Sequence, residues 1–241
     1  MDAAALPHPP PIEDIHEAMR RVTAAVREMP APSMFQLAAE GFGTPFEQLI
    51  ACIISIRTLE ETSLPVSRRL FAVARTPEQV AALPISELEQ LVTPATFPEP
   101  KAANIHAIAV RVRDEFGGNL PCDGEIMQSF NGVGPKCANL ALGIACGQPT
   151  IPVDIHVHRV VNRWGYVRAK TPEQTLAALE AKLPVEYRPA INRLLLPFGK
   201  YICTGGAPHC PSCPLIDICP KIGVTKVRRA VEKASRREAS T

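Results

Sequence analysis

Four of the eight cysteines lie close together near the C-terminal end of the chain, where they could bind a metal. They follow the spacing Cys-x6-Cys-x2-Cys-x5-Cys, at Cys203, Cys210, Cys213 and Cys219. Four thiolates suit either a tetrahedral zinc ion or a [4Fe–4S] cluster. Structural zinc sites more often use two Cys-x2-Cys pairs, and this segment has one close pair, so the spacing favours iron–sulfur and leaves zinc open. Four unligated cysteines are a third alternative.

The other four cysteines stand singly along the chain in apolar surroundings, at Cys52, Cys122, Cys137 and Cys146. A secreted domain built on disulfides would be shorter and would spread its cysteines more evenly. We therefore expect these four to be small buried residues.

A glycine turn, Gly132-Val133-Gly134-Pro135, stands directly before Lys136. Two glycines allow positive φ angles and leave backbone N–H groups uncovered. At the start of a helix, such N–H groups can bind a phosphate oxygen. The glycines alone are more typical of an ordinary turn between two helices, here expected over 123–130 and 136–146.

Lys136 favours a functional interpretation of this turn. A lysine in the first turn of a helix faces the positive end of the helix dipole, which disfavours its charged form. A neutral amine can act as a nucleophile toward an electrophilic sugar carbon.

Asp154 lies eighteen residues after Lys136, before a segment with helical spacing of apolar residues. It is therefore a natural N-cap, and a capping carboxylate at the edge of a cleft can also serve chemistry. His156 and His158 are two residues apart and fall on different faces of that helix, so we expect structural or phosphate-facing roles rather than a metal site.

The elements that position these residues are predicted to be helices. The chain has 241 residues, of which 46% are hydrophobic and 21% charged, as in globular proteins. A threonine followed directly by proline, with Glu or Gln three residues after the threonine, predicts a capped helix start. This pattern occurs at Thr44, Thr76 and Thr171, and Ser86 with Glu89 repeats it without proline. We also expect helices over 12–29 and 101–116. Only 150–153 looks like a short extended segment, so the fold class is all-α.

Charge and hydropathy place further limits on function. Lys and Arg number 26 against 24 Asp and Glu, but 221–241 holds seven basic and two acidic residues, so the rest of the chain is net negative. Binding to a nucleic acid must then depend on local geometry and this basic tail. No apolar run is long enough to span a bilayer and no secretory signal is visible, so we expect no membrane partner and an intracellular location, cytoplasmic and nucleoid-associated in a bacterium.

The glycine turn with its lysine, the later aspartate and the cysteine spacing together resemble endonuclease III, a family of helix-hairpin-helix DNA glycosylases. The resemblance covers roughly 45–220. It implies a six-helix barrel domain with the hairpin over 38–148. It also implies a helical domain over 12–37 and 149–222 that holds a [4Fe–4S] cluster through the four clustered cysteines. A flexible leader, 1–11, and a basic tail, 223–241, complete the expected organisation.

The resemblance also implies an activity and roles for single residues. The protein would be a monomeric, bifunctional DNA glycosylase/AP lyase of base excision repair that acts on double-stranded DNA with a damaged base or abasic site. Lys136 would displace an oxidised pyrimidine, form a Schiff base with the sugar and nick the strand by β-elimination, and Asp154 would assist. Gly132, Val133 and Gly134 would bind a backbone phosphate.

Several residues depart from the family pattern. Arg57 stands where the family has a glutamine that fills the gap left by the flipped base, and Glu60 stands at the family's aspartate. Phe97, followed by Pro98, is the candidate wedge on a changed loop. The hairpin begins with Phe130-Asn131 instead of Leu-Pro, and the basic residues that the family often has between the first two cysteines are missing from 204–209.

Two alternative functions share this scaffold. An adenine-mismatch glycosylase has the same cysteine spacing, but it normally lacks the nucleophilic lysine and has a further C-terminal domain, so Lys136 and the expected end at Thr241 argue against it. A DNA-binding iron–sulfur protein with little or no activity is the second alternative, because a fold does not fix a function.

Overall fold

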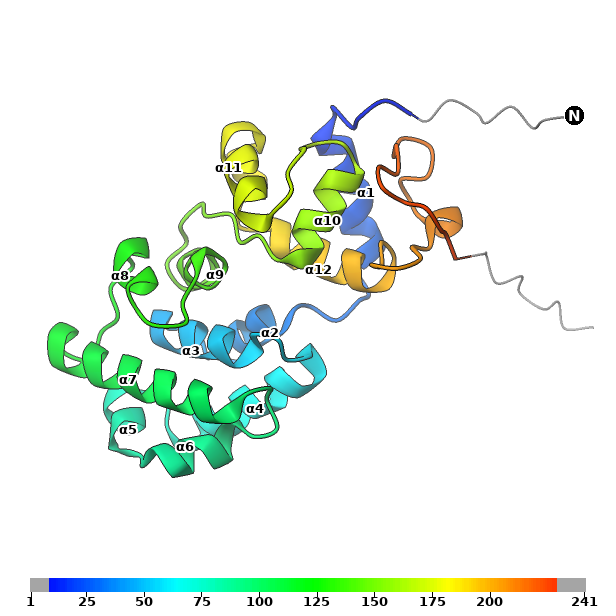
Figure 1. The fold of residues 1–241 in the computed structure, drawn as a ribbon. Coiled ribbons are helices and arrows are strands. Elements are labelled where there is room, and N and C mark those ends of the chain that lie inside the picture. Colours follow the sequence, from blue (N-terminus) through cyan, green and yellow to red (C-terminus); the bar gives the residue numbers. More distant parts are fainter. Residues whose placement is uncertain (1–8, 229–241) are drawn as a thin grey trace, which may run out of the picture.

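The computed structural model describes residues 9–228, and within them it contains twelve α-helices, two short 3₁₀ helices and no β-strand. The predicted all-α class is confirmed (Figure 1). The α-helices are α1 Ile15–Val26, α2 Ser33–Ala39, α3 Pro45–Ser55, α4 Glu60–Val73, α5 Pro77–Ala82, α6 Ile85–Val92, α7 Pro98–Phe116, α8 Gly124–Gln128, α9 Pro135–Ala145, α10 Ile155–Arg163, α11 Pro172–Lys182 and α12 Ile191–Tyr201. Most of the predicted leader and tail, 1–8 and 229–241, lies outside the described residues.

Side-chain caps explain where several helices begin. Thr44 and Thr76 form complete capping boxes with Glu47 and Gln79, as predicted. Thr171 caps α11 by accepting from the Gln174 N–H, but the Gln174 side chain bonds to the Lys170 N–H instead of closing the box. The predicted cap at Ser86 is wrong. Helix α6 begins at Ile85, two residues earlier than a cap at Ser86 would place it, and Pro84 at the N-cap position makes no side-chain cap hydrogen bond.

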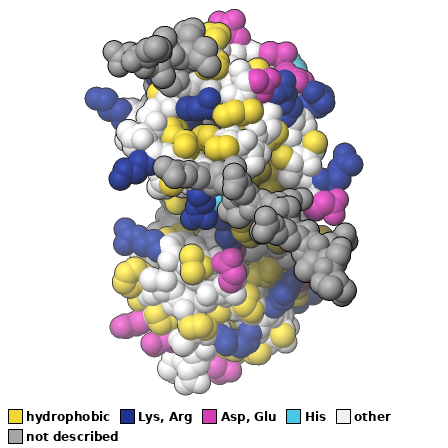
Figure 2. Space-filling model, turned by 90° about the vertical axis from the view of Figure 1, so that its right-hand side faces the viewer, with side chains coloured by type: hydrophobic (Ala, Val, Ile, Leu, Met, Phe, Trp, Pro, Cys, Tyr) yellow, Lys and Arg dark blue, Asp and Glu magenta, His cyan; other side chains and the backbone are white. Residues whose placement is uncertain are grey.

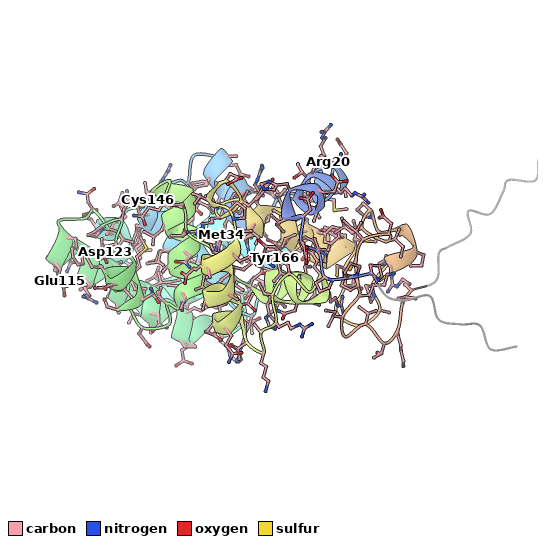
Figure 3. All side chains as sticks on the ribbon, turned by 90° about the horizontal axis from the view of Figure 1, so that it is seen from above. Arg20, Met34, Glu115, Asp123, Cys146 and Tyr166 are labelled. Atoms are coloured by element: carbon pink, nitrogen blue, oxygen red, sulfur yellow. A yellow bond between two sulfur atoms is a disulfide. The ribbon has the colours of Figure 1, made fainter. Side chains whose placement is uncertain are left out.

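The helices pack around two separate hydrophobic cores. One core is built from α2 to α9, with Leu49 and Ile105 among its fully buried side chains. The second joins α1 to α10–α12 and is centred on Trp164 and Phe198. Figure 1 shows the corresponding two lobes one above the other, and in Figure 3 Met34 and Cys146 mark the first lobe while Arg20 and Tyr166 mark the second.

Helix α2 belongs to the first lobe. Its residues Met34 and Leu37 pack in the first core, whereas the expected boundary placed 12–37 with the second domain. The domain limits as a whole stay a prediction. The segment 150–153, the one candidate for extended structure, forms no strand and runs between the lobes from α9 to α10.

The single cysteines differ from the expectation of unpaired buried residues. Cys52 of α3 is joined to Cys137 of α9, and Cys122 is joined to Cys146 at the end of α9. Cys122 is exposed rather than buried. Cysteine spacing in the sequence could not show these pairs, because the partners lie 85 and 24 residues apart and meet only through helix packing. Both pairs attach α9 to neighbouring segments.

The described residues form no strongly basic patch on the face that Figure 2 draws. Lys and Arg side chains are scattered over both lobes among Asp and Glu in Figure 2. Within 9–228, every helix is too short or too polar to cross a membrane.

Candidate active site

Lys136 lies in the first turn of α9, where this helix packs against α3. Its Nζ lies 3.5 Å from the Sγ of Cys52. Burial lowers the pKa of Lys136, while the negative charges of Asp154 and Glu60 act in the opposite direction. The lowered pKa agrees in direction with the expectation from the sequence, but the main cause is removal of the amine from water rather than the helix dipole.

Asp154 is the N-cap of α10 and reaches the same region from the second lobe. Its Oδ1 accepts hydrogen bonds from the backbone N–H groups of His156 and Val157, at 2.9 and 2.8 Å. Within the described chain, Oδ2 accepts none, and no direct ion pair joins Asp154 to Lys136. The cap thus fixes one oxygen in place and leaves the other available at the junction of the lobes.

Glu60 is a second carboxylate of this site, and its role was not predicted from the sequence. It is the first residue of α4, and its Oε1 accepts from the N–H and hydroxyl of Ser33, at 2.9 and 3.1 Å. Burial lowers the pKa of Lys136 and of His156, and the negative charge of Glu60 acts against that lowering at both groups. The only signal in the sequence was that an acidic residue occupies the position of the family's aspartate.

Lys200 of α12 connects the second lobe to this end of α4. Its Nζ forms an ion pair with Glu61 and lies 4.0 Å from Glu60. A charged contact therefore joins the two lobes at the start of α4.

The glycine turn is built as the sequence predicts, but its two glycines differ. Gly132 has a φ of +81°, and a Cβ there would lie 2.9 Å from Nδ2 of Asn104, so the fold itself requires glycine. Gly134 has a φ of −100°, and nothing in the protein lies within 4 Å of an added Cβ. The fold would therefore accept a larger residue in place of Gly134. Glycine at an open position of this kind is typical of a site that another molecule approaches closely.

The backbone of this turn offers free donors. Val133 is buried and its N–H bonds to Phe130 O at 3.2 Å, so its side chain serves the core. Within the described residues, the N–H groups of Gly132 and Gly134 donate to no other group. Asn131, a departure from the family pattern, donates to Oδ1 of Asn104 at 2.8 Å and so ties the turn to α7.

Arg57 and Phe97 lie on two loops of the first lobe. Arg57 is exposed, and Phe97 keeps 55% of its surface exposed. Both adopt the left-handed backbone region, with φ of +54° and +57°. Thr58 joins the two loops, because its Oγ1 accepts from the Thr96 N–H at 3.0 Å.

The four clustered cysteines are unpaired and line one pocket with Trp164 and Phe198. Burial raises the pKa of Cys213 to about 12 and of Cys219 to about 11. Arg163 donates to the Sγ of Cys203 at 3.3 Å and to the carbonyls of Thr204 and Gly205.

Four thiols around one pocket are a donor set that suits soft metals, zinc and iron–sulfur clusters alike. Four soft sulfur ligands converge on a pocket with apolar walls, and a guanidinium faces one of them. Across residues 9–228, no three His, Cys, Asp or Glu side chains come close enough together to hold one metal ion.

The arrangement as a whole combines an amine of lowered pKa, two carboxylates and a turn with free N–H donors. Such a site suits attack by an amine on a substrate whose phosphate is bound beside it.

Comparison with known proteins gives consistent similarities. Residues 50–184 match the model of the HhH-GPD superfamily of base excision DNA repair proteins. The chain is 35% identical over 192 residues to endonuclease III of Thermotoga maritima. This match covers 78% of the chain and 90% of that protein. It is 32% identical over 178 residues to endonuclease III of Escherichia coli K12, covering 74% and 84%.

Solved structures give the same pattern. A trapped endonuclease III–DNA covalent intermediate and a non-covalent endonuclease III–DNA complex each superpose with a TM-score of 0.75 at 30% identity, covering 86% of this chain and 94% of theirs. A thermostable thymine-DNA glycosylase, with a TM-score of 0.72 at 19% identity, is similar in fold.

Proposed function

Because the chain belongs to the endonuclease III family of DNA glycosylase/lyases, within the HhH-GPD superfamily of base excision DNA repair proteins, we propose that it removes oxidised pyrimidines from duplex DNA and then nicks the strand through Lys136. The observation that carries the proposal is the placement of the Lys136 amine. It is half-buried at the junction of the two lobes, with a lowered pKa and with the charges of Asp154 and Glu60 close enough to act on it.

Lys136 is the proposed nucleophile. Its neutral amine attacks C1′ of a nucleotide extruded from the duplex, and the damaged base leaves with the electrons of the glycosidic bond and takes up a proton. The nitrogen then gives up one proton, and the C1′–O4′ bond of the sugar breaks as O4′ takes up a proton, which leaves a protonated Schiff base between C1′ and Lys136. Loss of a proton from C2′ and departure of the 3′ phosphate complete the β-elimination.

Asp154 is proposed to act through its free oxygen. With Oδ1 held by two backbone N–H groups, Oδ2 can accept a proton from the attacking amine and stabilise positive charge on the sugar. Glu60 adds a second negative charge to the same region. Neither carboxylate bonds directly to the amine, which leaves room for the sugar.

The glycine turn is proposed to bind a backbone phosphate beside the extruded nucleotide. Its free Gly132 and Gly134 N–H groups are the donors, and the open space at Gly134 lets the strand approach. Arg57 and Phe97 are proposed to enter the duplex, Phe97 as a wedge and Arg57 at the base left unpaired. Arginine donates but does not accept, so it suits guanine's acceptors.

We propose that Cys203, Cys210, Cys213 and Cys219 hold a [4Fe–4S] cluster. When bound, such a cluster crosslinks the loop through iron–thiolate bonds. Arg163 holds this loop from α10, since it donates to Cys203, Thr204 and Gly205.

Excision and nicking of a duplex with one oxidised pyrimidine test the proposal. The wild type should release the base and cut the strand 3′ to the lesion. Lys136→Gln should bind the same duplex but neither release the base nor nick the strand. Asp154→Asn should keep its cap, because asparagine caps well, but lose excision. Nicking by Lys136→Gln at the wild-type rate would contradict the proposal.

A further inference from the structure

Lys101 is a buried cation to which the proposed chemistry assigns no role. It lies in the first turn of α7, and its side chain is 6% exposed. Its Nζ donates to the carbonyls of Ile54 and Ile56, at 2.7 and 2.8 Å, and to Oγ1 of Thr58, at 2.9 Å. These three acceptors are neutral. Two of them are carbonyls at the C-terminal end of α3, where the helix dipole favours a positive charge.

Thr58 is the second member of this network. Its Oγ1 accepts from Lys101 Nζ and from the backbone N–H of Thr96, at 3.0 Å. Thr58 follows Arg57 directly, and Thr96 precedes Phe97 directly. A single hydroxyl therefore connects the two loops that carry the exposed Arg57 and Phe97.

The backbone at both exposed residues needs such support. Arg57 and Phe97 have φ of +54° and +57°, a region that residues other than glycine rarely adopt. Strained conformations persist where surrounding contacts fix them, and they cluster at functional sites. Lys101 bonds to the residues on both sides of Arg57, namely Ile56 and Thr58, and its own backbone N–H bonds to Phe97 O at 3.3 Å.

We infer that Lys101 and Thr58 are positioning residues that hold Arg57 and Phe97 side by side for entry into the duplex. The inference rests on the proposed function, in which these two side chains replace an extruded nucleotide. This role concerns only one of two parts of the reaction, the extrusion of the nucleotide and not the chemistry at Lys136. The network serves extrusion from the duplex, while the chemistry at Lys136 needs no extrusion when the abasic site lies in single-stranded DNA.

A comparison of duplex with single-stranded substrate tests this separation. Thr58→Val keeps the shape of the side chain but removes the shared acceptor, and Lys101→Met removes the cation at similar length. Thr93→Val is the matched control, because among residues 9–228 the Thr93 hydroxyl bonds only to Glu89 O in the preceding helix. The two measurements are single-turnover excision of an oxidised pyrimidine from duplex DNA and borohydride trapping on a single-stranded abasic oligonucleotide.

Thr58→Val and Lys101→Met should slow duplex excision by about tenfold to a hundredfold, as misplacement of positioning groups does, and change single-stranded trapping by less than about twofold. Thr93→Val should match the wild type in both. If Lys101→Met does not fold, as judged by its circular dichroism, Thr58→Val alone decides the outcome.

Equal losses on both substrates by folded Thr58→Val would overturn the inference, because they would indicate a general structural role. Unchanged duplex excision would also overturn it. A wild-type chain that traps neither substrate would contradict the proposed function itself, and the positioning role with it.

Discussion

Lys136 experiences opposing electrostatic effects at the junction of the lobes. Burial lowers the pKa of its amine, and the charges of Asp154 and Glu60 raise it. The lowered pKa makes the neutral, nucleophilic form more abundant at neutral pH than it is for an exposed lysine. The two carboxylates can then stabilise the positive charge that develops when the base leaves.

The two glycines of the hairpin allow a sharp comparison at a single residue. Gly134→Ala should fold with wild-type stability, because its φ is negative and its surroundings are open. Its Cβ would obstruct a DNA strand at the free N–H groups, so its affinity for abasic duplex should fall by about tenfold, the equivalent of one lost hydrogen bond to a charged group.

Gly132→Ala is the contrasting variant. A φ of +81° and the contact with Asn104 should lower its melting temperature. Melting curves and titrations of both variants with labelled abasic duplex check these expectations. Unchanged affinity of Gly134→Ala would show that no strand approaches this turn.

At the scale of the helix, local rules explain the starts of several elements. Thr44 caps α3 through a complete box, in which its Oγ1 accepts from the Glu47 N–H and its own N–H donates to Oε2 of Glu47. The same buried Glu47 also binds Arg75, so this box connects α3 to the end of α4. Ser86, which has the same sequence signature, lies inside α6 and caps nothing.

These two positions test how far the capping pattern determines stability. Thr44→Ala should lower the free energy of unfolding by about 1 kcal/mol. In a protein of this size, that is a fall of about 2–4 °C in melting temperature. Ser86→Ala should change it little or raise it slightly, because alanine is the better helix former at an exposed helical position. Equal losses in both variants would show that Ser86 does cap α6.

The sequence predicted the helical class, the caps at Thr44, Thr76 and Asp154 and the direction of the pKa shift at Lys136. The helical class and the caps depend on neighbours within a few residues, so local sequence patterns predict them, whereas the pKa shift at Lys136 arises mainly from burial, which depends on packing. It missed the cysteine pairs, the influence of Glu60 on Lys136 and the Lys101 network. Each of these joins segments far apart along the chain, and only the packing of α3, α4, α7 and α9 brings them together.

At the scale of the whole molecule, the proposed site depends on the relative placement of two lobes with separate cores. Lys136 comes from the first lobe and Asp154 from the second, and the ion pair between Lys200 and Glu61 joins the lobes beside them. The cysteine loop lies in the second lobe and is held there by Arg163.

The cluster should therefore support structure and binding more than chemistry. The purified protein should contain about four irons per chain, as four-thiolate [4Fe–4S] ligation requires. Cys210→Ser should lower the melting temperature and the affinity for duplex DNA by more than it lowers trapping on abasic single strands. Metal analysis and binding titrations check this. One zinc per chain and no iron would contradict it.

The central claim is that Lys136 is the nucleophile, and the identity of the residue joined to DNA tests it most directly. The wild-type protein is incubated with abasic duplex and borohydride, and the adduct is digested and sequenced by mass spectrometry. Our account predicts a sugar-derived mass on Lys136, with no adduct from Lys136→Gln under the same conditions. A trapped adduct on any other residue, or one formed by Lys136→Gln at the wild-type yield, would contradict it.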